Sequence, residues 1–302
     1  SLIGSVPKKY SWILSIIGME GNLDSGLSLM NSTIKKMKTH DDFSYMVEET
    51  YFLYAFLKMN LDNNQNDLKE LLKEIERSNF LLLNFAASRI ATQIGNNDLA
   101  IKILDDRVRG KAYYPFHYLD YLIAVGKQNK LDESCIEYFE LYLNNFSGIN
   151  YKKSSLIRMS WHYLINGDEQ NFINYRNKIN DLEGLYIGAD KEAQFFFDNK
   201  IKPHKNLLKA RLYFDGGNYD KALENLDTID KQKIKNNTFD NLKYHYRMGR
   251  VYEKLNNSKE AILYYKETIS KSSSEYLHFS AKAALQLGLI YEKIGDKKQA
   301  SD

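Results

Sequence analysis

The sequence has little cysteine, little proline and no long apolar run. Its 302 residues include one cysteine, Cys135, and three prolines, at positions 7, 115 and 203. A single cysteine excludes an internal disulfide and a metal site built from several cysteines. Scarce proline favours long helices. Residues 12–19 form one of the longest apolar runs, well short of the roughly 20 residues that cross a bilayer, so we expect no transmembrane segment.

The sequence also lacks a strong excess of charge of either sign. Lysine and arginine total 42 and aspartate and glutamate total 39, which gives a net charge of +3. These charges are interspersed along the chain, whereas a nucleic-acid-binding protein shows a concentrated basic stripe, so we expect no nucleic-acid partner. Aromatic residues make up 13% of the chain, which is enough apolar surface to favour a folded protein.

What the sequence does contain is a repeat. Residues 209–213, 248–252 and 287–291 align without gaps, with small residues at Ala210, Gly249 and Gly288 and a tyrosine three positions later. The spacing is 39 residues, and alanines at 222, 261 and 300 keep it. Turn dipeptides separate the small residue from the alanine in each copy. The pattern predicts a repeated helical hairpin, because small residues allow two helices to cross closely.

These residues resemble the tetratricopeptide repeat, whose pattern is Leu-Gly-x-x-Tyr followed by alanine and an aromatic residue. The match starts at positions 203, 242 and 281. It departs from the family pattern at its fourth position, which holds Asn206, His245 and Ala284 instead of tryptophan. The resemblance implies an all-α fold, a right-handed α-α superhelix of about seven to eight stacked hairpins.

We expect three parts along this solenoid. Residues 1–180 read as degenerate tetratricopeptide-like hairpins, with turns near residues 95, 125–134 and 166–168. Residues 181–202 read as an irregular hinge or loop with a short helix, and residues 203–302 as three repeats, the last one truncated. Since Ser1 is not an initiator methionine and residue 302 interrupts a repeat, we expect further residues at both ends.

A glycine-rich element near the start carries a second resemblance. Gly21 and Gly26 have the separation of a phosphate-binding loop, but Leu27 stands where the essential lysine belongs, which argues against a nucleotide cofactor. Residues 17–27 resemble instead an element of the tetratricopeptide-repeat-39 group and its inclusion-body-clearance relatives. Bacterial proteins of the same layout look similar. The resemblance implies a multi-repeat protein without enzymatic activity.

No catalytic or metal-binding constellation emerges from the other residues. The nearest ligand-like spacing, His117 with Asp120, is typical of a polar helix surface. Cys135 would act as a nucleophile only beside a base, and the sequence names none, so we interpret it as a small buried side chain. We predict no catalytic residue, no metal and no cofactor.

The tetratricopeptide resemblance does imply a partner groove, lined by the second, fifth, ninth and twelfth positions of the first helix of each repeat. The candidate groove residues are His204, Leu207, Arg211, Phe214, Lys243, Tyr246, Arg250 and Lys282. Such a basic, aromatic-edged groove suits an acidic segment or a C-terminal carboxylate of a protein partner. The alternative is that the arginines pair with Glu253 and neighbouring acids on a solvated face, and Leu289, which interrupts the basic row, favours it.

The sequence therefore predicts a scaffold for protein–protein interaction, an accessory subunit of a larger assembly. Asn, Lys, Ile and Tyr usage typical of bacteria suggests association with the cell envelope, and the compartment stays open between periplasm or outer membrane and cytoplasm. The alternative is a peptide-sensing transcription regulator. Its helix-turn-helix module would have to lie outside this chain, because residues 8–17 are too apolar to read a DNA groove.

Overall fold

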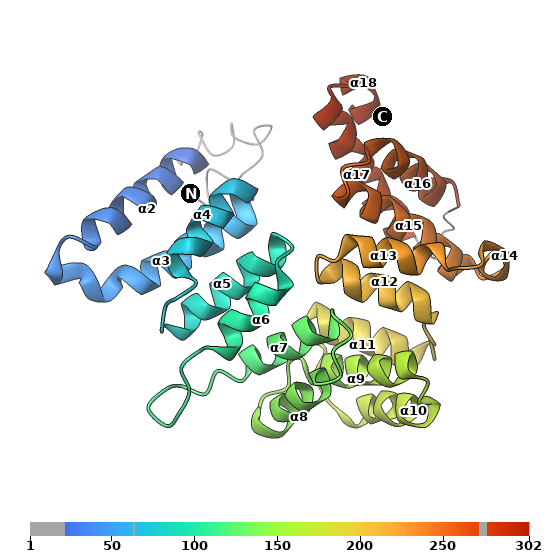
Figure 1. Cartoon of the computed structure of the whole chain (residues 1–302), viewed down its shortest axis with the longest axis horizontal. Coiled ribbons are helices and arrows are strands. Elements are labelled where there is room, and N and C mark those ends of the chain that lie inside the picture. The colour runs from blue at the N-terminus through green and yellow to red at the C-terminus, as the bar shows by residue number, and fades with distance from the viewer. Residues whose placement is uncertain (1–21, 63, 272–276, 302) are drawn as a thin grey trace. The chain divides into compact units, whose positions relative to one another are not determined.

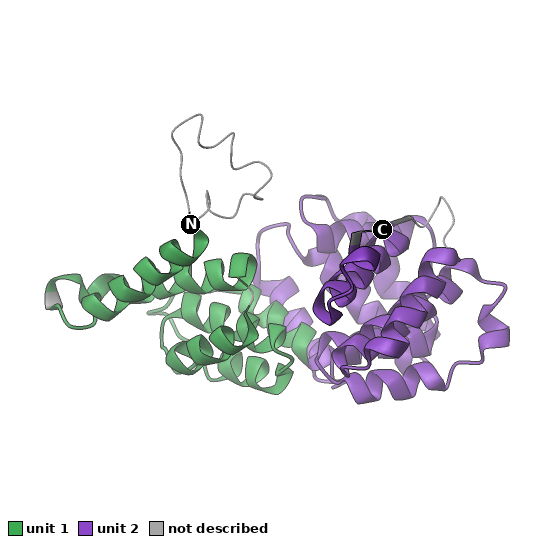
Figure 2. Cartoon of the chain, turned by 90° about the horizontal axis from the view of Figure 1, so that it is seen from above, with its two compact units in different colours: residues 1–126 green, residues 127–302 purple. Residues whose placement is uncertain are grey.

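A computed structural model describes residues 22–62, 64–271 and 277–301, and every regular element within these ranges is a helix. The all-α prediction is confirmed. The chain divides into two compact units, residues 1–126 and 127–302 (Figure 2). Gly18 and Gly21 of the glycine-rich element lie outside the described residues, whereas Gly26 lies inside the first described helix.

Unit 1 is built from helices that pack against their neighbours in the chain. Its core lies around α5, where Ala86, Ala87, Ile90 and Ala91 are fully enclosed. The described elements are α2 (Leu23–Met37), η3 (Asp41–Met46), α3 (Val47–Leu57), η4 (Lys58–Asp62), α4 (Gln65–Ile75), α5 (Leu81–Gln93), α6 (Asn97–Asp105) and α7 (Tyr118–Gln128), whose last residues pass the boundary between the units (Figure 1).

Unit 2 continues as helical pairs. Helices α9 and α10, α12 and α13, and α15 and α16 lie side by side as consecutive hairpins (Figure 1). Its elements are α8 (Cys135–Asn145), α9 (Lys152–Asn166), α10 (Glu169–Asn177), η5 (Lys178–Asp181), α11 (Gly188–Asp198), α12 (Lys205–Asp215), α13 (Tyr219–Asp227), α14 (Lys231–Ile234), α15 (Thr238–Lys254), α16 (Ser258–Ser270), α17 (Leu277–Ile294) and α18 (Lys297–Ser301).

The 39-residue repeat has a conformational counterpart in the turns of these hairpins. Gly217, Asn256 and Gly295 all have positive φ, at 76°, 59° and 84°, and they stand 39 residues apart. In each case the next residue, Asn or Asp, accepts a hydrogen bond from a backbone N–H three residues further on and so caps the second helix. A left-handed residue followed by an Asx cap reverses the chain at the same point of every copy.

The same turn occurs upstream, where the sequence pattern is weak. Gly95, Leu131 and Gly167 also have positive φ, and their spacing is 36 residues. The N–H of the following residue bonds to the carbonyl five positions back in each, as Asn96 does to Ala91 at 2.8 Å. The predicted upstream hairpin turns are therefore present, and their regularity is clearer in the backbone than in the residue types, because Leu131 is not a turn residue by propensity.

The small residue of the repeat is required by the crossing of α15 and α16. A Cβ atom built on Gly249 would approach the Tyr265 ring to 2.7 Å, closer than side-chain atoms tolerate. The ring of Tyr252, three residues later, stacks on Tyr264 with centroids 5.7 Å apart. The predicted roles of the small residue and the tyrosine are confirmed in this hairpin.

One segment of unit 2 departs from the hairpin pattern. After η5, residues 182–187 form no regular element, and α11 then packs on α9 rather than on a partner of its own. Asp190 of α11 accepts hydrogen bonds from the backbone N–H groups of Tyr151 and Ser154, at 2.7 and 2.9 Å, and so caps α9 from outside. The extra helix matters for the site, because it brings acidic and aromatic side chains beside the repeats.

Candidate partner-binding pocket

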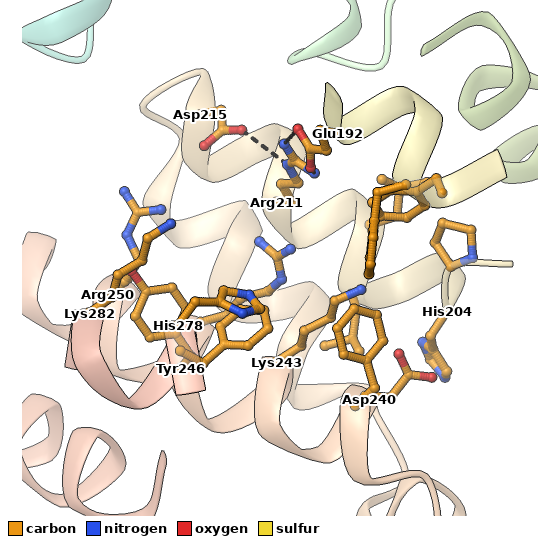
Figure 3. A pocket seen from close by; sticks show the side chains of 18 residues that line it. Glu192, His204, Arg211, Asp215, Asp240, Lys243, Tyr246, Arg250, His278 and Lys282 are labelled. Atoms are coloured by element: carbon orange, nitrogen blue, oxygen red, sulfur yellow. Dashed lines mark hydrogen bonds and ion pairs between the residues drawn. The ribbon is translucent and has the colours of Figure 1, made fainter. Parts of the chain in front are cut away.

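The predicted groove positions come together in one pocket of unit 2, with a volume of about 400 Å³. Helices α11, α12, α15 and α17 supply its walls (Figure 3). Of the eight candidate groove residues, those that line it are His204, Leu207, Arg211, Lys243, Tyr246, Arg250 and Lys282. The exception is Phe214, whose ring lies outside the lining under the guanidinium of Arg250, with 4.1 Å from the guanidinium carbon to the ring centroid.

Arg211 is neutralised within the protein. Its guanidinium donates two hydrogen bonds to the Glu192 carboxylate, at 2.5 and 3.0 Å, and lies 3.6 Å from Asp215 (Figure 3). It also lies over the Trp161 ring, 5.1 Å from the centroid. Glu192 and Asp215 hold the pKa of Arg211 above its usual range despite burial. Arg211 and Glu192 therefore form a structural ion pair at one end of the pocket.

The acid predicted as the arginines' partner is engaged elsewhere. Glu253 accepts a hydrogen bond from the Tyr265 hydroxyl at 2.6 Å. Arg211 pairs instead with Asp215, four residues later, and with Glu192 of α11, which lies outside the repeat register. Arg250, the other arginine of the predicted row, rests on the rings of Phe214 and Tyr246.

Lys243 is the most buried cation of the pocket. Its side chain is 8% exposed, and the amine lies 3.5 Å from the Phe239 ring centroid and 5.3 Å from that of Phe196. Burial and the neighbouring Arg247 lower the pKa of Lys243 to about 7, against an opposing effect of Asp240. Within the described ranges the amine makes no hydrogen bond or ion pair, so its contacts are with aromatic faces.

Among the lysines and arginines that line the pocket, Arg247 is the one that the groove positions missed. It stands four residues after Lys243, on the same face of α15, and its Nε atom is buried without a hydrogen-bond partner. Burial and the nearby Arg211 lower the pKa of Arg247 to about 10. The i, i+4 spacing of two cations on a predicted helix was the signal that could have identified it.

The rim of the pocket adds weaker groups. Lys282 and His278 of α17 are exposed, and the Nδ1 atom of His204 is buried without a hydrogen-bond partner. Five lysines and arginines line the pocket against three acids, Glu192, Asp215 and Asp240, an excess of two positive charges with the histidines neutral. The pocket is a cationic, aromatic-walled recess that can attract an anionic group.

The other residues considered for catalysis or metal binding, Cys135 and the pair His117 and Asp120, are accounted for by packing and ion pairing. Cys135 does have an imidazole beside it, since its Sγ lies 3.6 Å from Nδ1 of His162. The thiol is fully enclosed, however, and burial raises its pKa to about 12, so it is not a thiolate at neutral pH. Asp120, of the His117 pair, forms a buried ion pair with Arg107. Across the described ranges no group of three or more potential ligands could hold a metal ion, and no helix is long and apolar enough to cross a membrane.

Comparison with known families supports both resemblances. A family model described as Tetratricopeptide repeat matches residues 242–270, which hold most of α15 and all of α16. This hairpin is thus similar to a tetratricopeptide repeat. A model described as Iml2/Tetratricopeptide repeat protein 39 matches residues 2–119, so the first part of the chain resembles that group. No curated protein matches the chain. The hairpin matched as a repeat is the one that contributes Lys243, Arg247 and Arg250 to the pocket.

Proposed function

We propose that this chain is a non-enzymatic scaffold for protein–protein interaction, and that the pocket of unit 2 holds an acidic segment or C-terminal carboxylate of its partner. The observation that carries the proposal is the excess of positive charge in a recess formed by the first helices of consecutive repeats. Tetratricopeptide repeats present such faces to protein segments, and carboxylates bind arginine and lysine through charge-assisted hydrogen bonds.

The position of the cations supports a peptide rather than a purely apolar partner. Arg250 and Lys282 come from α15 and α17, two successive first helices, so a segment that runs across both would meet a cation at each. Tyr246 of α15 packs against Phe279 of α17, with ring centroids 5.5 Å apart. An acidic segment with apolar side chains would thus meet both charge and ring surface.

We further propose that the scaffold is an accessory subunit of a larger assembly, associated with a bacterial cell envelope. The support is the repeat architecture together with the residue usage of the sequence. Reconstitution of the assembly from the native source would test it: a chain that purifies alone and without partners under native extraction would contradict this part of the proposal.

The pocket is tested by charge reversal at its rim. We choose Arg250→Glu with Lys282→Glu, because neither residue forms an ion pair among the described residues. A fluorescent library of acidic peptides is screened by anisotropy against the full chain, and the double variant is expected to lose most of the affinity. The matched control is Lys254→Glu with Lys259→Glu, two exposed lysines outside the pocket. Equal affinity of both double variants would contradict the proposal.

A further inference from the structure

Two cations of the pocket, the buried Lys243 and the half-buried Arg247, form no ion pair with any residue that the structure describes. Lys243 is 8% exposed and meets only aromatic rings, and Arg247 has a buried Nε without an acceptor. Burying a charge without a partner costs several kcal/mol, so proteins rarely leave one in that state. Asp240, which faces Lys243, accepts a hydrogen bond from the side-chain amide of Asn237 at 3.1 Å, and its own backbone N–H donates to the Asn237 Oδ1 atom. The recess therefore holds positive charge that no acid compensates, and an anionic ligand would compensate it.

The amount of excess positive charge in the pocket indicates the charge of that ligand. Arg211 shares Glu192 and Asp215, and the pocket as a whole has an excess of two positive charges. A carboxylate carries one negative charge and two acceptor atoms. A phosphate monoester carries nearly two negative charges at pH 7 and three acceptor oxygens. The dianion thus matches the charge excess, and it offers Lys243 and Arg247 one more acceptor oxygen than a carboxylate does.

The walls are suited to what such a phosphate would be attached to. The rings of Phe196, Phe239 and Phe279 line the same recess, whose volume of about 400 Å³ falls in the range of small-ligand sites. In Figure 3 the Lys243 side chain reaches into the middle of the pocket, while the ion pairs of Arg211 lie at its far end. The cations and the apolar surface are therefore close enough to serve one ligand.

We infer that this pocket binds a phosphate monoester, with Lys243 and Arg247 contacting the phosphoryl oxygens, Lys282 at the entrance and the phenylalanine rings against the organic part. The group can come from a phosphorylated side chain of the docking segment or from a free small molecule. In the first case the inference rests on the proposed function and specifies it, and in the second it adds a ligand to the same pocket.

The pH dependence of binding follows from the groups around Lys243. Because the pKa of Lys243 lies at about 7, the amine is largely neutral at pH 8.5 and must take up a proton to face the dianion. Below about pH 6 the phosphate loses its second charge. Affinity is therefore highest between about pH 6 and pH 7. The charged and titratable groups that face Lys243 are Asp240 and Arg247 on α15, Arg211 on α12, Glu192 on α11, and His278 and Lys282 on α17.

The test is calorimetric titration of the full chain at pH 6.5 with phenyl phosphate and with phenyl sulfate, which has the same shape and one negative charge. We expect phenyl phosphate to bind at least about tenfold more tightly. Arg247→Gln should weaken phenyl phosphate about 10- to 100-fold, whereas Lys259→Gln, which removes an exposed charge of α16, should leave it unchanged. Equal binding of the two anions, or an Arg247→Gln variant that binds like the wild type, would overturn the inference.

Two further arms identify the mechanism and the source. At pH 8.5 the wild type should lose about tenfold in affinity, and Lys243→Arg, whose charge persists, should lose less; equal losses would contradict the role of Lys243. A phosphoserine peptide is then compared with phenyl phosphate: tighter peptide binding assigns the phosphate to a partner, and equal binding assigns it to a small molecule. Binding of unphosphorylated acidic peptides is measured separately, so the proposed function and this inference can fail independently.

Discussion

The buried cations of the two units differ in one respect. In unit 1, Lys58 is paired with Asp62 and Asp67, and Arg107 is paired with Asp120, so each buried charge has an acid of its own. In unit 2, Arg211 follows this rule through Glu192 and the buried Lys153 amine donates to Gln194 at 2.6 Å, whereas Lys243 and Arg247 have no such partner within the described ranges. A paired buried cation is explained by the fold. An unpaired one costs stability, and such groups concentrate at functional sites, which is why the pocket and not unit 1 carries the functional proposal.

The largest expected effect comes from breaking a pair in unit 1. Asp120→Ala leaves the Arg107 guanidinium, whose side chain is 7% exposed, buried without its carboxylate. The free energy of unfolding should fall by about 3–5 kcal/mol. Denaturant unfolding followed by circular dichroism measures it. A loss below about 1 kcal/mol would mean that the pair is not buried in solution and would remove one side of the comparison.

In the pocket, replacing an unpaired lysine is expected to raise the free energy of unfolding. Lys243→Met replaces a buried amine by an apolar side chain of similar length between Phe196 and Phe239, and should raise the free energy of unfolding by about 1–4 kcal/mol at pH 7. Since the folded pKa of about 7 lies below that of the unfolded chain, the wild type gains stability as the pH rises from 7 toward 10.4.

The advantage of Lys243→Met should therefore shrink over that pH interval, and urea unfolding at pH 7 and pH 9.5 measures the change. A variant less stable than the wild type at pH 7 would show that the lysine contributes to the fold, and the distinction between the two units would then disappear.

Lys58→Met is the matched lysine substitution in unit 1. Lys58 is 7% exposed, close to the value for Lys243, but its removal strands Asp62 and Asp67, which keep some solvent contact. We expect a loss of about 1–2 kcal/mol in the free energy of unfolding. The comparison is sharpest when both lysine variants are measured in the same denaturant series, because the two side chains have similar exposed fractions and differ in whether an acid pairs with them.

Lowering the pH is expected to have a smaller effect on stability, through His245 of unit 2. Burial, assisted by Lys271, lowers the pKa of His245 to about 4, and its Nδ1 atom has no partner. The unfolded chain therefore binds a proton that the folded chain does not between about pH 6.5 and pH 4, and stability falls as the pH falls through this range. Between pH 7 and pH 4.5 the free energy of unfolding should fall by about 1 kcal/mol less in His245→Leu than in the wild type. Thermal unfolding at the two pH values measures the difference. An unchanged slope would contradict the assignment.

Most of the fold of unit 2 could be predicted from the sequence. The 39-residue spacing identified the hairpins, because the small residue at 249 and the turn at 256 have direct steric roles. The 36-residue spacing of Gly95, Leu131 and Gly167 was missed, since it is a repeat of backbone conformation and Leu131 does not signal a turn.

The pocket was predictable in part. Groove positions from the repeat register placed Arg211, Lys243 and Arg250 in one groove, and all three line the pocket. The pairing of Arg211 was beyond the sequence, because Glu192 comes from α11, a helix outside the repeat pattern. The division of the chain at residues 180 and 203, and a hinge between them, stay predictions.

The central claim is that the pocket holds a lysine without an acid until a ligand supplies one. The most direct measurement is the titration of the Lys243 amine by NMR of the side-chain ε-carbon, assigned with Lys243→Arg, in the free chain and with phenyl phosphate. The account predicts a pKa of about 7 in the free chain that moves upward, toward the usual value of about 10.4, when the ligand binds. A free-chain pKa already near 10.4, or one that phenyl phosphate leaves unchanged, would contradict it.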